Sequence, residues 1–409
     1  MQDLQKRNIV AGLDIGTSKI CAIIGEVNRN NRLDIVGIGV SPSAGIKKGV
    51  IVDIDSTVDS ITQAVKKAEQ MANVNLGSVF INYTGGNINL LKNRGIVAVT
   101  GENKEITHQD IERVIQAARV VAVPSDKEII DIMPIEFIVD GYNGIKDPMG
   151  MVGTRLEVDA YIIMGSTTSV QNLIKSVQRS GLMVEGIILG PLAASQIILS
   201  RDEKELGVAL LDIGGGTSDI SIFSGGNLIF TATLPIGGEH ITNDIAIGLR
   251  IPISLAEGIK KSYGCALISH GDPGVEIEIK RIGDQQASKI TQQDLAEIIE
   301  PRVQEIFVLI KRELSRTGNI KLLPAGAVIT GGGVYSLKGA QELASQILDM
   351  PVRMGNPEYL GANEPMFSVA VGIIEFAFRN KGYRLHITDK KKNIQGIFLK
   401  MKDWIKDYF

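Results

Sequence analysis

The stretch Leu211-Asp212-Ile213-Gly214-Gly215-Gly216-Thr217-Ser218-Asp219 decides the fold of this chain. An apolar run at 207–210 precedes it and an alternating run at 220–223 follows it, which predicts a strand, a tight glycine turn and a second strand. Because the three glycines have no side chains, the backbone N–H groups of the turn can approach an anion closely. Asp212, at the strand end, is placed to hold a hydrated Mg2+. For a lone glycine turn of this kind, an ordinary hairpin is the favoured interpretation.

The turn has a counterpart near the start of the chain, Gly12-Leu13-Asp14-Ile15-Gly16-Thr17-Ser18-Lys19. Both stretches contain Asp-Ile-Gly followed by Thr-Ser, and they lie about half the chain length apart. Two similar halves, each with a phosphate-binding hairpin, predict a duplicated fold that closes on a nucleotide. A third glycine cluster, Gly331-Gly332-Gly333, follows another apolar run, and its backbone could pack flat on a base or ribose.

These three elements, in this order and spacing, resemble the actin/Hsp70/sugar-kinase superfamily. The resemblance implies an α/β, actin-like fold, in which a duplicated ribonuclease-H-like unit forms two lobes around a nucleotide cleft. ATP and Mg2+ are the implied cofactors, with the metal held through water by Asp14 and Asp212. The implied phosphate and adenosine contacts are Asp14, Gly16, Thr17, Ser18, Lys19, Asp212, Gly214, Gly215, Gly216, Thr217, Gly331, Gly332 and Gly333.

The composition excludes several classes of protein. The 409 residues are 44% hydrophobic and 22% charged, as expected for a globular chain of several domains. A formal net charge of −3 provides no basic field for nucleic acid. Two cysteines, Cys21 and Cys265, are too few for a disulfide framework, and the four histidines lack ligand spacing. No stretch reaches the roughly 18 apolar residues of a membrane-spanning helix.

The pattern changes between Thr84 and about Ala160, where no second nucleotide motif occurs. A strand at 95–100, a helix capped by Thr107 and Asp110, and strands at 128–137 and 156–164 are expected there. The segments 134–140 and 144–150 resemble the SHS2-type subdomain inserted in FtsA, a family of actin-like bacterial cell-division proteins. The domains expected are 1–83 with 161–200 (first core), 84–160 (insert), 201–240 with 325–380 (second core), 241–324 (outer subdomain), 381–395 (linker) and 396–409 (amphipathic helix).

Gly190-Pro191-Leu192-Ala193-Ala194 departs from the superfamily pattern. Hydrolytic relatives have Glu-Pro-x-Ala-Ala at the comparable segment, and that acidic residue helps to position the attacking water. Gly190 has no side chain with which to do so. Since positioning is a large part of phosphoryl-transfer catalysis, ATP binding with weak or no ATPase activity is expected.

The second half carries three further candidate features. A helix beginning near Gly238 could direct its N-terminus at phosphate. Glu257 and Lys260 lie one helical turn apart, which in isolation indicates a surface ion pair worth about 0.3–0.5 kcal/mol. The superfamily's Glu-x-x-Lys contacts ribose and purine, which implies that role for Glu257, Lys260 and Lys261.

Capping boxes are expected at Ser56–Asp59 and at Thr291–Asp294, the second of which opens a long helix to about Arg316 that Pro301 interrupts. Within it, Glu300-Pro301-Arg302 resembles the FtsA helix that binds the acidic C-terminal peptide of FtsZ, the tubulin-like division protein. The resemblance makes Arg302 the candidate contact. An ordinary solvated helix charge is the alternative.

The sequence predicts a polar, flexible tether at 381–395 and an amphipathic stretch at 396–409. Fourteen residues make about 21 Å of helix, too short to span a bilayer. An aromatic face with a basic flank favours binding in the lipid interface, whereas docking back on the protein's own body is the alternative. One helical face carries Ile397, Phe398, Met401, Trp404, Ile405, Tyr408 and Phe409.

The resemblance to FtsA extends over nearly the whole chain and implies a polymer-forming, ATP-binding protein at the cytoplasmic face of the cell membrane, at the division site. Implied partners are the FtsZ C-terminal peptide, further copies of the chain, later division proteins of the membrane and anionic lipid. Two alternatives remain: an actin-like component of a pilus assembly machine, and an actin-superfamily ATPase or sugar kinase.

Overall fold

The computed structural model describes residues 8–85, 88–318 and 323–380. Its centre consists of two five-stranded sheets, ordered β11-β6-β1-β2-β3 and β14-β13-β12-β17-β18. Read from the opposite edge, the second sheet repeats the first: three antiparallel strands continue into two parallel ones. The predicted duplicated, two-lobed α/β architecture is confirmed.

The first core contains β1 (Ile9–Ile15), β2 (Lys19–Val27), β3 (Leu33–Pro42), β6 (Ser78–Tyr83) and β11 (Met183–Leu189). A short hairpin, β4 (Ile46–Lys47) and β5 (Val50–Ile51), precedes α1 (Ile54–Ala72), and α3 (Thr167–Arg179) follows the insert. The predicted capping box at Ser56–Asp59 is wrong. Asp53 caps α1 instead, because its carboxylate accepts the backbone N–H groups of Asp55 and Ser56.

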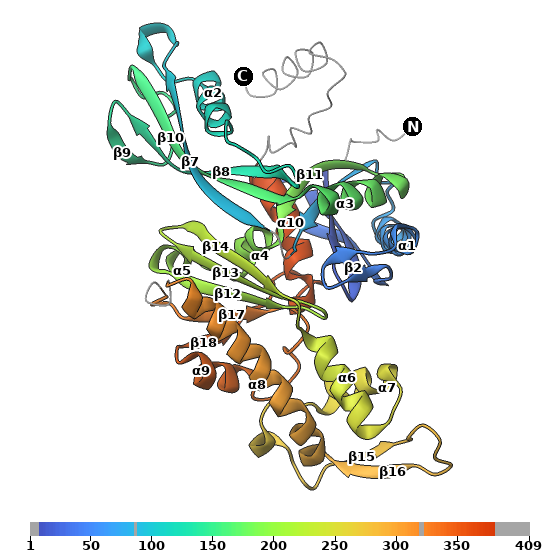
Figure 1. Ribbon diagram of the computed structural model, residues 1–409. Coiled ribbons are helices and arrows are strands. Elements are labelled where there is room, and N and C mark those ends of the chain that lie inside the picture. Colours follow the sequence, from blue (N-terminus) through green and yellow to red (C-terminus); the bar gives the residue numbers. More distant parts are fainter. Residues whose placement is uncertain (1–7, 86–87, 319–322, 381–409) are drawn as a thin grey trace.

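The insert forms a separate sheet, ordered β7-β10-β8-β9, and projects from the first core at the upper left of Figure 1. Its strands are β7 (Asn89–Ala98), β8 (Lys127–Val139), β9 (Tyr142–Ile145) and β10 (Arg155–Ser166). The helix α2 (His108–Ala118) packs on β7 and β10 around its own small hydrophobic cluster. The predicted capping box of Thr107 and Asp110 is confirmed.

The second core contains β12 (Val208–Ile213), β13 (Ser218–Ser224), β14 (Asn227–Leu234), β17 (Ala327–Thr330), β18 (Val352–Met354) and α9 (Ala340–Leu348). The outer part comprises α6 (Gly238–Leu249), α7 (Ile253–Tyr263), β15 (Glu276–Ile279), β16 (Ser288–Thr291) and α8 (Gln292–Arg316). Short 3-10 turns occupy Glu102–Lys104, Ile268–His270 and Pro365–Phe367.

The helix α8 has the predicted capping box of Thr291 and Asp294 but is not interrupted at Pro301. A proline inside a helix loses one backbone hydrogen bond. The buried face of α8, which includes Ile299, Val303 and Phe307, spans that position and holds the helix together.

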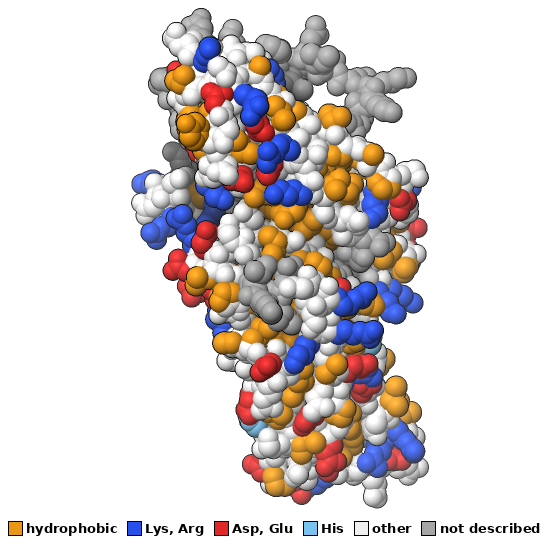
Figure 2. Space-filling view, turned by 60° about the vertical axis from the view of Figure 1, so that its left-hand side comes forward, with side chains coloured by type: hydrophobic (Ala, Val, Ile, Leu, Met, Phe, Trp, Pro, Cys, Tyr) orange, Lys and Arg blue, Asp and Glu red, His pale blue; other side chains and the backbone are white. Residues whose placement is uncertain are grey.

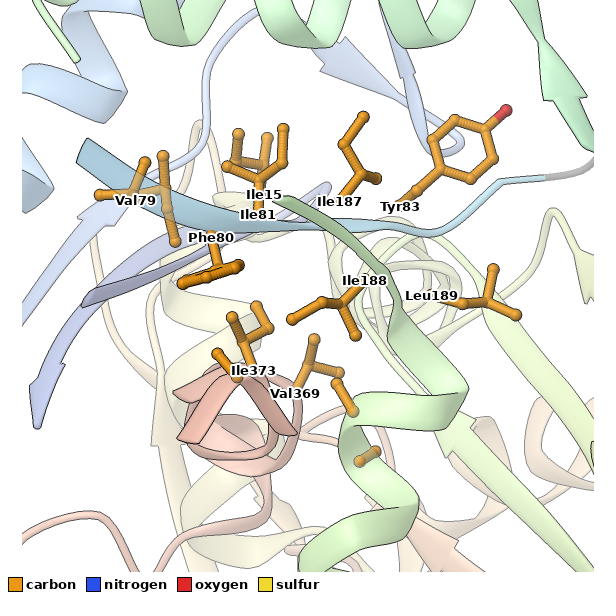
Figure 3. Packing of buried hydrophobic residues seen from close by; sticks show 14 of the residues in the cluster. Ile15, Val79, Phe80, Ile81, Tyr83, Ile187, Ile188, Leu189, Val369 and Ile373 are labelled. Atoms are coloured by element: carbon orange, nitrogen blue, oxygen red, sulfur yellow. The ribbon is translucent and has the colours of Figure 1, made fainter. Parts of the chain in front are cut away.

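The remaining helices are α4 (Gly190–Ile198), which contacts strands of both sheets, α5 (Arg201–Leu206) and α10 (Ser368–Arg379). The predicted boundaries group α10 with the second core, yet it packs on β1, β2, β6 and α4 of the first. In Figure 3, Val369 and Ile373 of α10 face Phe80 and Ile188. Gly12 permits this approach, since a Cβ there would lie 3.0 Å from the side chain of Ile373.

Within the described ranges, no helix has the length and apolar character needed to cross a bilayer. On the face shown in Figure 2, positive and negative side chains are mixed over the length of the molecule. The predicted tether at 381–395 and the amphipathic stretch at 396–409 lie outside the described residues.

Candidate functional site

The two predicted phosphate turns, at 16–18 and 214–217, touch each other where the lobes meet. Hydrogen bonds close both, from Gly16 N to Lys19 O (3.0 Å) and from Gly214 N to Thr217 O (2.9 Å). A Cβ at Gly215 would lie 2.6 Å from Ser18 Oγ, and one at Gly216 would lie 2.6 Å from Thr17 Cγ2. A side chain at either position would force Ser18 or Thr17 to move, so glycine lets the turns approach this closely.

A polar row crosses the second sheet directly below its turn. Asp212 on β12 lies opposite Asp219 on β13, which lies opposite Thr233 on β14. The Thr233 hydroxyl donates to the Asp219 carboxylate. The equivalent row of the first sheet carries Asp14 opposite Cys21.

The carboxylates of this row have strongly shifted pKa values. Burial, followed by the charges of Asp219 and Asp14, raises the pKa of Asp212 to about 7. Burial also raises the pKa of Asp219 to about 6, with a further contribution from Asp14 and an opposing one from the Thr233 hydrogen bond. Both shifts show that the buried acid groups are only partly compensated by positive charge.

Asp14 is held from two sides. Its carboxylate accepts hydrogen bonds from Lys19 Nζ (3.1 Å) and from Asn82 Nδ2 (2.8 Å). Burial alone would lower the pKa of Lys19, but Asp14, Cys21 and Asp212 raise it. Asn82 Oδ1 also accepts the backbone N–H of Ile15 (2.8 Å), so one side chain fixes both the strand end and its acid.

Sequence reasoning missed Asn82. The available signal was an amide side chain inside the otherwise apolar strand β6, at the position next to Asp14 across the parallel pair β1–β6. A buried polar side chain needs a partner, and in a strand neighbouring Asp14 that partner was predictable.

The charge of the acid cluster fits a divalent cation held through water. Asp14, Asp212 and Asp219 outnumber Lys19 there, so a cation would relieve their mutual repulsion. In the part of the chain that the structure describes, no three His, Cys, Asp or Glu side chains converge closely enough to ligate a metal directly. The water-mediated role of Asp14 and Asp212 stays a prediction.

The third glycine cluster lies against the second turn. Gly333 N donates to Ile213 O (2.7 Å), and a Cβ at Gly331 would lie 2.3 Å from Asp212 Oδ1. Gly331 also adopts a positive φ of 85°, which favours glycine. The structure thus places Gly331, Gly332 and Gly333 at the strand end of β17, beside the acid row.

The N-terminus of α6 supports the second turn. Gly238 N and Glu239 N donate to the carbonyl oxygens of Gly214 (2.9 Å) and Gly215 (2.8 Å). The backbone N–H groups of Gly238 and Glu239, in the first turn of helix α6, are therefore already hydrogen-bonded to the second phosphate turn. The prediction that this helix end faces phosphate directly does not hold for these two groups. Gly238 acts on the turn as a positioning residue.

The predicted pair of Glu257 and Lys260 is not an ordinary surface ion pair. The Lys260 side chain is 3% exposed, and its Nζ contacts Glu257 Oε2 (2.7 Å), Thr242 Oγ1 (2.8 Å) and Gly238 O (3.1 Å). Burial lowers the pKa of Lys260. Lys261, 62% exposed, reaches the other oxygen of Glu257. Lys260 thereby ties α7 to the start of α6, while Glu257 and Lys261 remain accessible.

Gly190 lies at the start of α4, against Thr84. A Cβ at position 190 would lie 2.2 Å from Thr84 Cγ2. The space from which an acidic side chain would project is therefore filled by a methyl group of the neighbouring strand end.

Arg302 is paired rather than freely solvated. Its Nε and Nη2 contact the two carboxylate oxygens of Asp244 on α6, at 2.6 and 3.1 Å, and its Nη1 contacts Glu305. The side chain is 28% exposed. The bidentate pair joins α8 to α6 on the outer subdomain.

Two family models match the chain. The one described as "Cell division protein FtsA" matches residues 209–372, and "SHS2 domain inserted in FTSA" matches residues 85–164. A Pseudomonas aeruginosa relative named "Cell division protein FtsA" is 40% identical over 100% of both chains. Relatives of that name from Bacillus subtilis (44%, covering 92% of this chain and 85% of the relative) and Escherichia coli (34%, 98% and 96%) also match.

Solved structures share the fold at low sequence identity. A chain of the PilM-PilN type IV pilus biogenesis complex is 17% identical with a TM-score of 0.63, covering 90% of this chain and 98% of that chain. MreB5 of Spiroplasma citri, solved bound to ADP, is 16% identical with a TM-score of 0.55, covering 92% and 99%. These similarities confirm the predicted actin-like fold with an inserted SHS2-type subdomain.

Proposed function

This chain belongs to the FtsA family of cell-division proteins, and we propose that it is a nucleotide-binding, filament-forming adaptor that links FtsZ to the cytoplasmic face of the membrane. The observation that carries the nucleotide part of the proposal is the meeting of the two glycine turns above the acid row. The FtsZ and membrane parts rest on the sequence resemblance and on the pattern of residues 396–409.

ATP would bind with its phosphates between the turns at 16–18 and 214–217. Lys19 and the turn amides would contact phosphate, and Asp14 and Asp212 would orient the hydration shell of Mg2+, which supplies compensating charge. Gly331, Gly332 and Gly333 would lie against the base or ribose, with Glu257 and Lys261 at its edge and the buried Lys260 holding Glu257 in position. Such a ligand contacts both lobes at once, so it stabilises their closed arrangement.

Nucleotide would act as a structural ligand more than as a fuel. Gly190 offers no carboxylate to a water, and Thr84 fills the adjacent space. Slow or absent hydrolysis leaves the lobes closed for long periods. Closed lobes present a constant surface, which favours assembly of the chain with further copies of itself.

Arg302 would contact the acidic C-terminal peptide of FtsZ. Because Arg302 already pairs with Asp244, a peptide carboxylate would compete for the guanidinium or share it. The variant Arg302→Ala tests this contact by fluorescence anisotropy with a labelled FtsZ C-terminal peptide, and we expect about tenfold weaker binding. Arg316→Ala, at an exposed position of the same helix, is the control. Equal affinities of wild type and Arg302→Ala would remove Arg302 from the proposed contact.

The amphipathic stretch at 396–409 would bind the lipid interface. Seven apolar side chains at about 1.5 kcal/mol each give on the order of 10 kcal/mol when well buried. Ordering fourteen residues opposes this by a comparable amount. A single tail therefore binds weakly, and a filament that carries many tails binds firmly through avidity. Later division proteins of the membrane would meet the filament there.

Flotation with anionic liposomes and ATP tests the membrane part of the proposal. The full-length chain is compared with a chain that ends at Asn393 and with a full-length Trp404→Glu variant. We expect only the unaltered full-length protein to float, and more of it above the concentration at which it assembles. Equal flotation of all three chains, or of none, would reject the tail as the membrane anchor.

The alternative roles have weaker support. The pilus-assembly structure shares the fold at 17% identity, whereas relatives at 34–44% identity are named as cell-division proteins. Turnover of candidate sugars by the purified chain would favour a kinase.

A further inference from the structure

The β4–β5 hairpin ends in an unusual turn. Because Lys47 pairs with Val50, the two central residues of the turn are Lys48 and Gly49. Both have positive φ, 50° and 77°. Two-residue turns of this kind strongly prefer Asn-Gly, since most side chains are strained in the left-handed region. A lysine at the first central position therefore adopts a conformation that lysine does not favour, and an outlier of this kind motivates a search for a functional role.

The turn lies directly over the candidate phosphate site. Gly49 N donates to Thr17 Oγ1 (3.2 Å) in the first phosphate turn. A Cβ at Gly49 would lie 3.7 Å from Thr217 Cγ2 in the second turn and 3.8 Å from Thr84 O. Gly49 therefore contacts both turns where they meet. The Cα of Lys48 is one peptide unit away, about 3.8 Å, and its flexible four-carbon stem exceeds that distance.

The ammonium group of Lys48 has no ion-pair partner among the described residues. Within the described ranges of the chain, neither Lys47 nor Lys48 forms an ion pair, and both are exposed. Thr17 and Thr217 belong to the turns whose strands carry Asp14 and Asp212, so the surroundings already have excess negative charge. The phosphates of a nucleotide would add to that excess, and a nearby ammonium group would be attracted to them.

We propose that Lys48 binds the terminal phosphate of a nucleoside triphosphate held between the two turns, with Gly49 and Thr17 as its positioning residues. The inference rests on the proposed nucleotide function and assigns a residue that distinguishes triphosphate from diphosphate. The hairpin base is fixed to α1, because Val52 N and Asp53 N donate to Gly45 O (2.8 and 3.1 Å) and Asp53 caps that helix. If the Lys48–Gly49 turn moves toward a bound phosphate, the hairpin will pull on Asp53 and so on the first turn of α1.

The test compares the affinities of the full-length protein for fluorescent ATP and ADP analogues with Mg2+. Lys48→Asn removes the charge and keeps a residue that tolerates the turn. We expect it to weaken ATP binding about tenfold and ADP binding less than about twofold, as for loss of one charge-assisted contact. Lys48→Arg restores most of the difference. Lys47→Asn, with the same charge change one residue away, leaves the ratio of affinities unchanged.

Two outcomes would overturn the assignment: equal weakening of ATP and ADP by Lys48→Asn, or an equal effect of Lys47→Asn. Either result would mean that the turn contributes only a general positive field. Thermal unfolding of Lys48→Asn at or above the wild-type temperature excludes a folding defect. If the wild-type protein binds neither analogue, the nucleotide part of the proposed function fails, and this inference fails with it.

Discussion

At the scale of single residues, Thr84 and Gly190 form a pair that can be tested without any ligand. Gly190→Ala places a Cβ 2.2 Å from Thr84 Cγ2, so we expect a loss of about 1–3 kcal/mol in the free energy of unfolding. Thr84→Ser removes that methyl group and should restore most of the loss in the double variant. Urea unfolding of the four chains gives the coupling energy. Additive effects would show that the two side chains do not compete for this space.

The acid row predicts an unusual dependence of stability on pH. Asp212 and Asp219 have pKa values of about 7 and about 6 in the folded protein, against roughly 4 when unfolded. Between about pH 4 and 7 the folded state holds more protons, so their contribution to stability falls as pH rises. Asp212→Asn should therefore stabilise the nucleotide-free protein relative to wild type by a few kcal/mol more at pH 8 than at pH 4.5. Asp59→Asn, at an exposed position, is the control in urea unfolding, and a pH-independent difference would contradict the expectation.

At the scale of elements, the contact between α6 and α7 depends on one buried ammonium group. Lys260→Met leaves Gly238 O and Thr242 Oγ1 without this donor, and we expect a loss of about 2–3 kcal/mol in the free energy of unfolding. Lys261→Met removes the exposed partner of Glu257, the carboxylate that Lys260 also contacts. We expect this variant to change the free energy of unfolding by less than about 0.5 kcal/mol. Denaturant unfolding distinguishes the two. Similar small effects would mean that Lys260 contributes no more than a surface charge.

The elements also show what sequence patterns could and could not predict. Both glycine hairpins and the caps at Thr107 and Thr291 follow from local rules, because turn and cap geometry is set within a few residues. The local pattern places the cap of α1 three residues too late, because Asp53 and Ser56 both fit it. Asn82 was missed, because its role depends on a partner in another strand.

At the scale of the whole molecule, closure of the lobes depends on glycines without side chains in the second phosphate turn, at 214–217. Gly216→Ala would bring a Cβ to 2.6 Å from Thr17 Cγ2, across the contact between lobes. We expect a larger radius of gyration by small-angle X-ray scattering and about tenfold weaker nucleotide binding, for a strain of about 1–3 kcal/mol. Gly77→Ala, whose Cβ would meet no atom within 4 Å and which lies outside both turns, is the control. If the Gly216→Ala protein is as compact as wild type, the Thr17 side chain moves aside and the lobes stay closed.

The packing of α10 on the first sheet has a consequence for how the protein is synthesised. Strand β1 is among the first described residues to leave the ribosome, whereas Val369 and Ile373, which cover the face of its sheet, are among the last. Translation at roughly 5–20 residues per second separates these events by some tens of seconds. During that time the nascent chain exposes an apolar sheet face that its own later residues will bury. The first lobe to be translated is thus among the last to be completed, and a nascent-chain chaperone that shields Phe80 and Ile188 would find its substrate there.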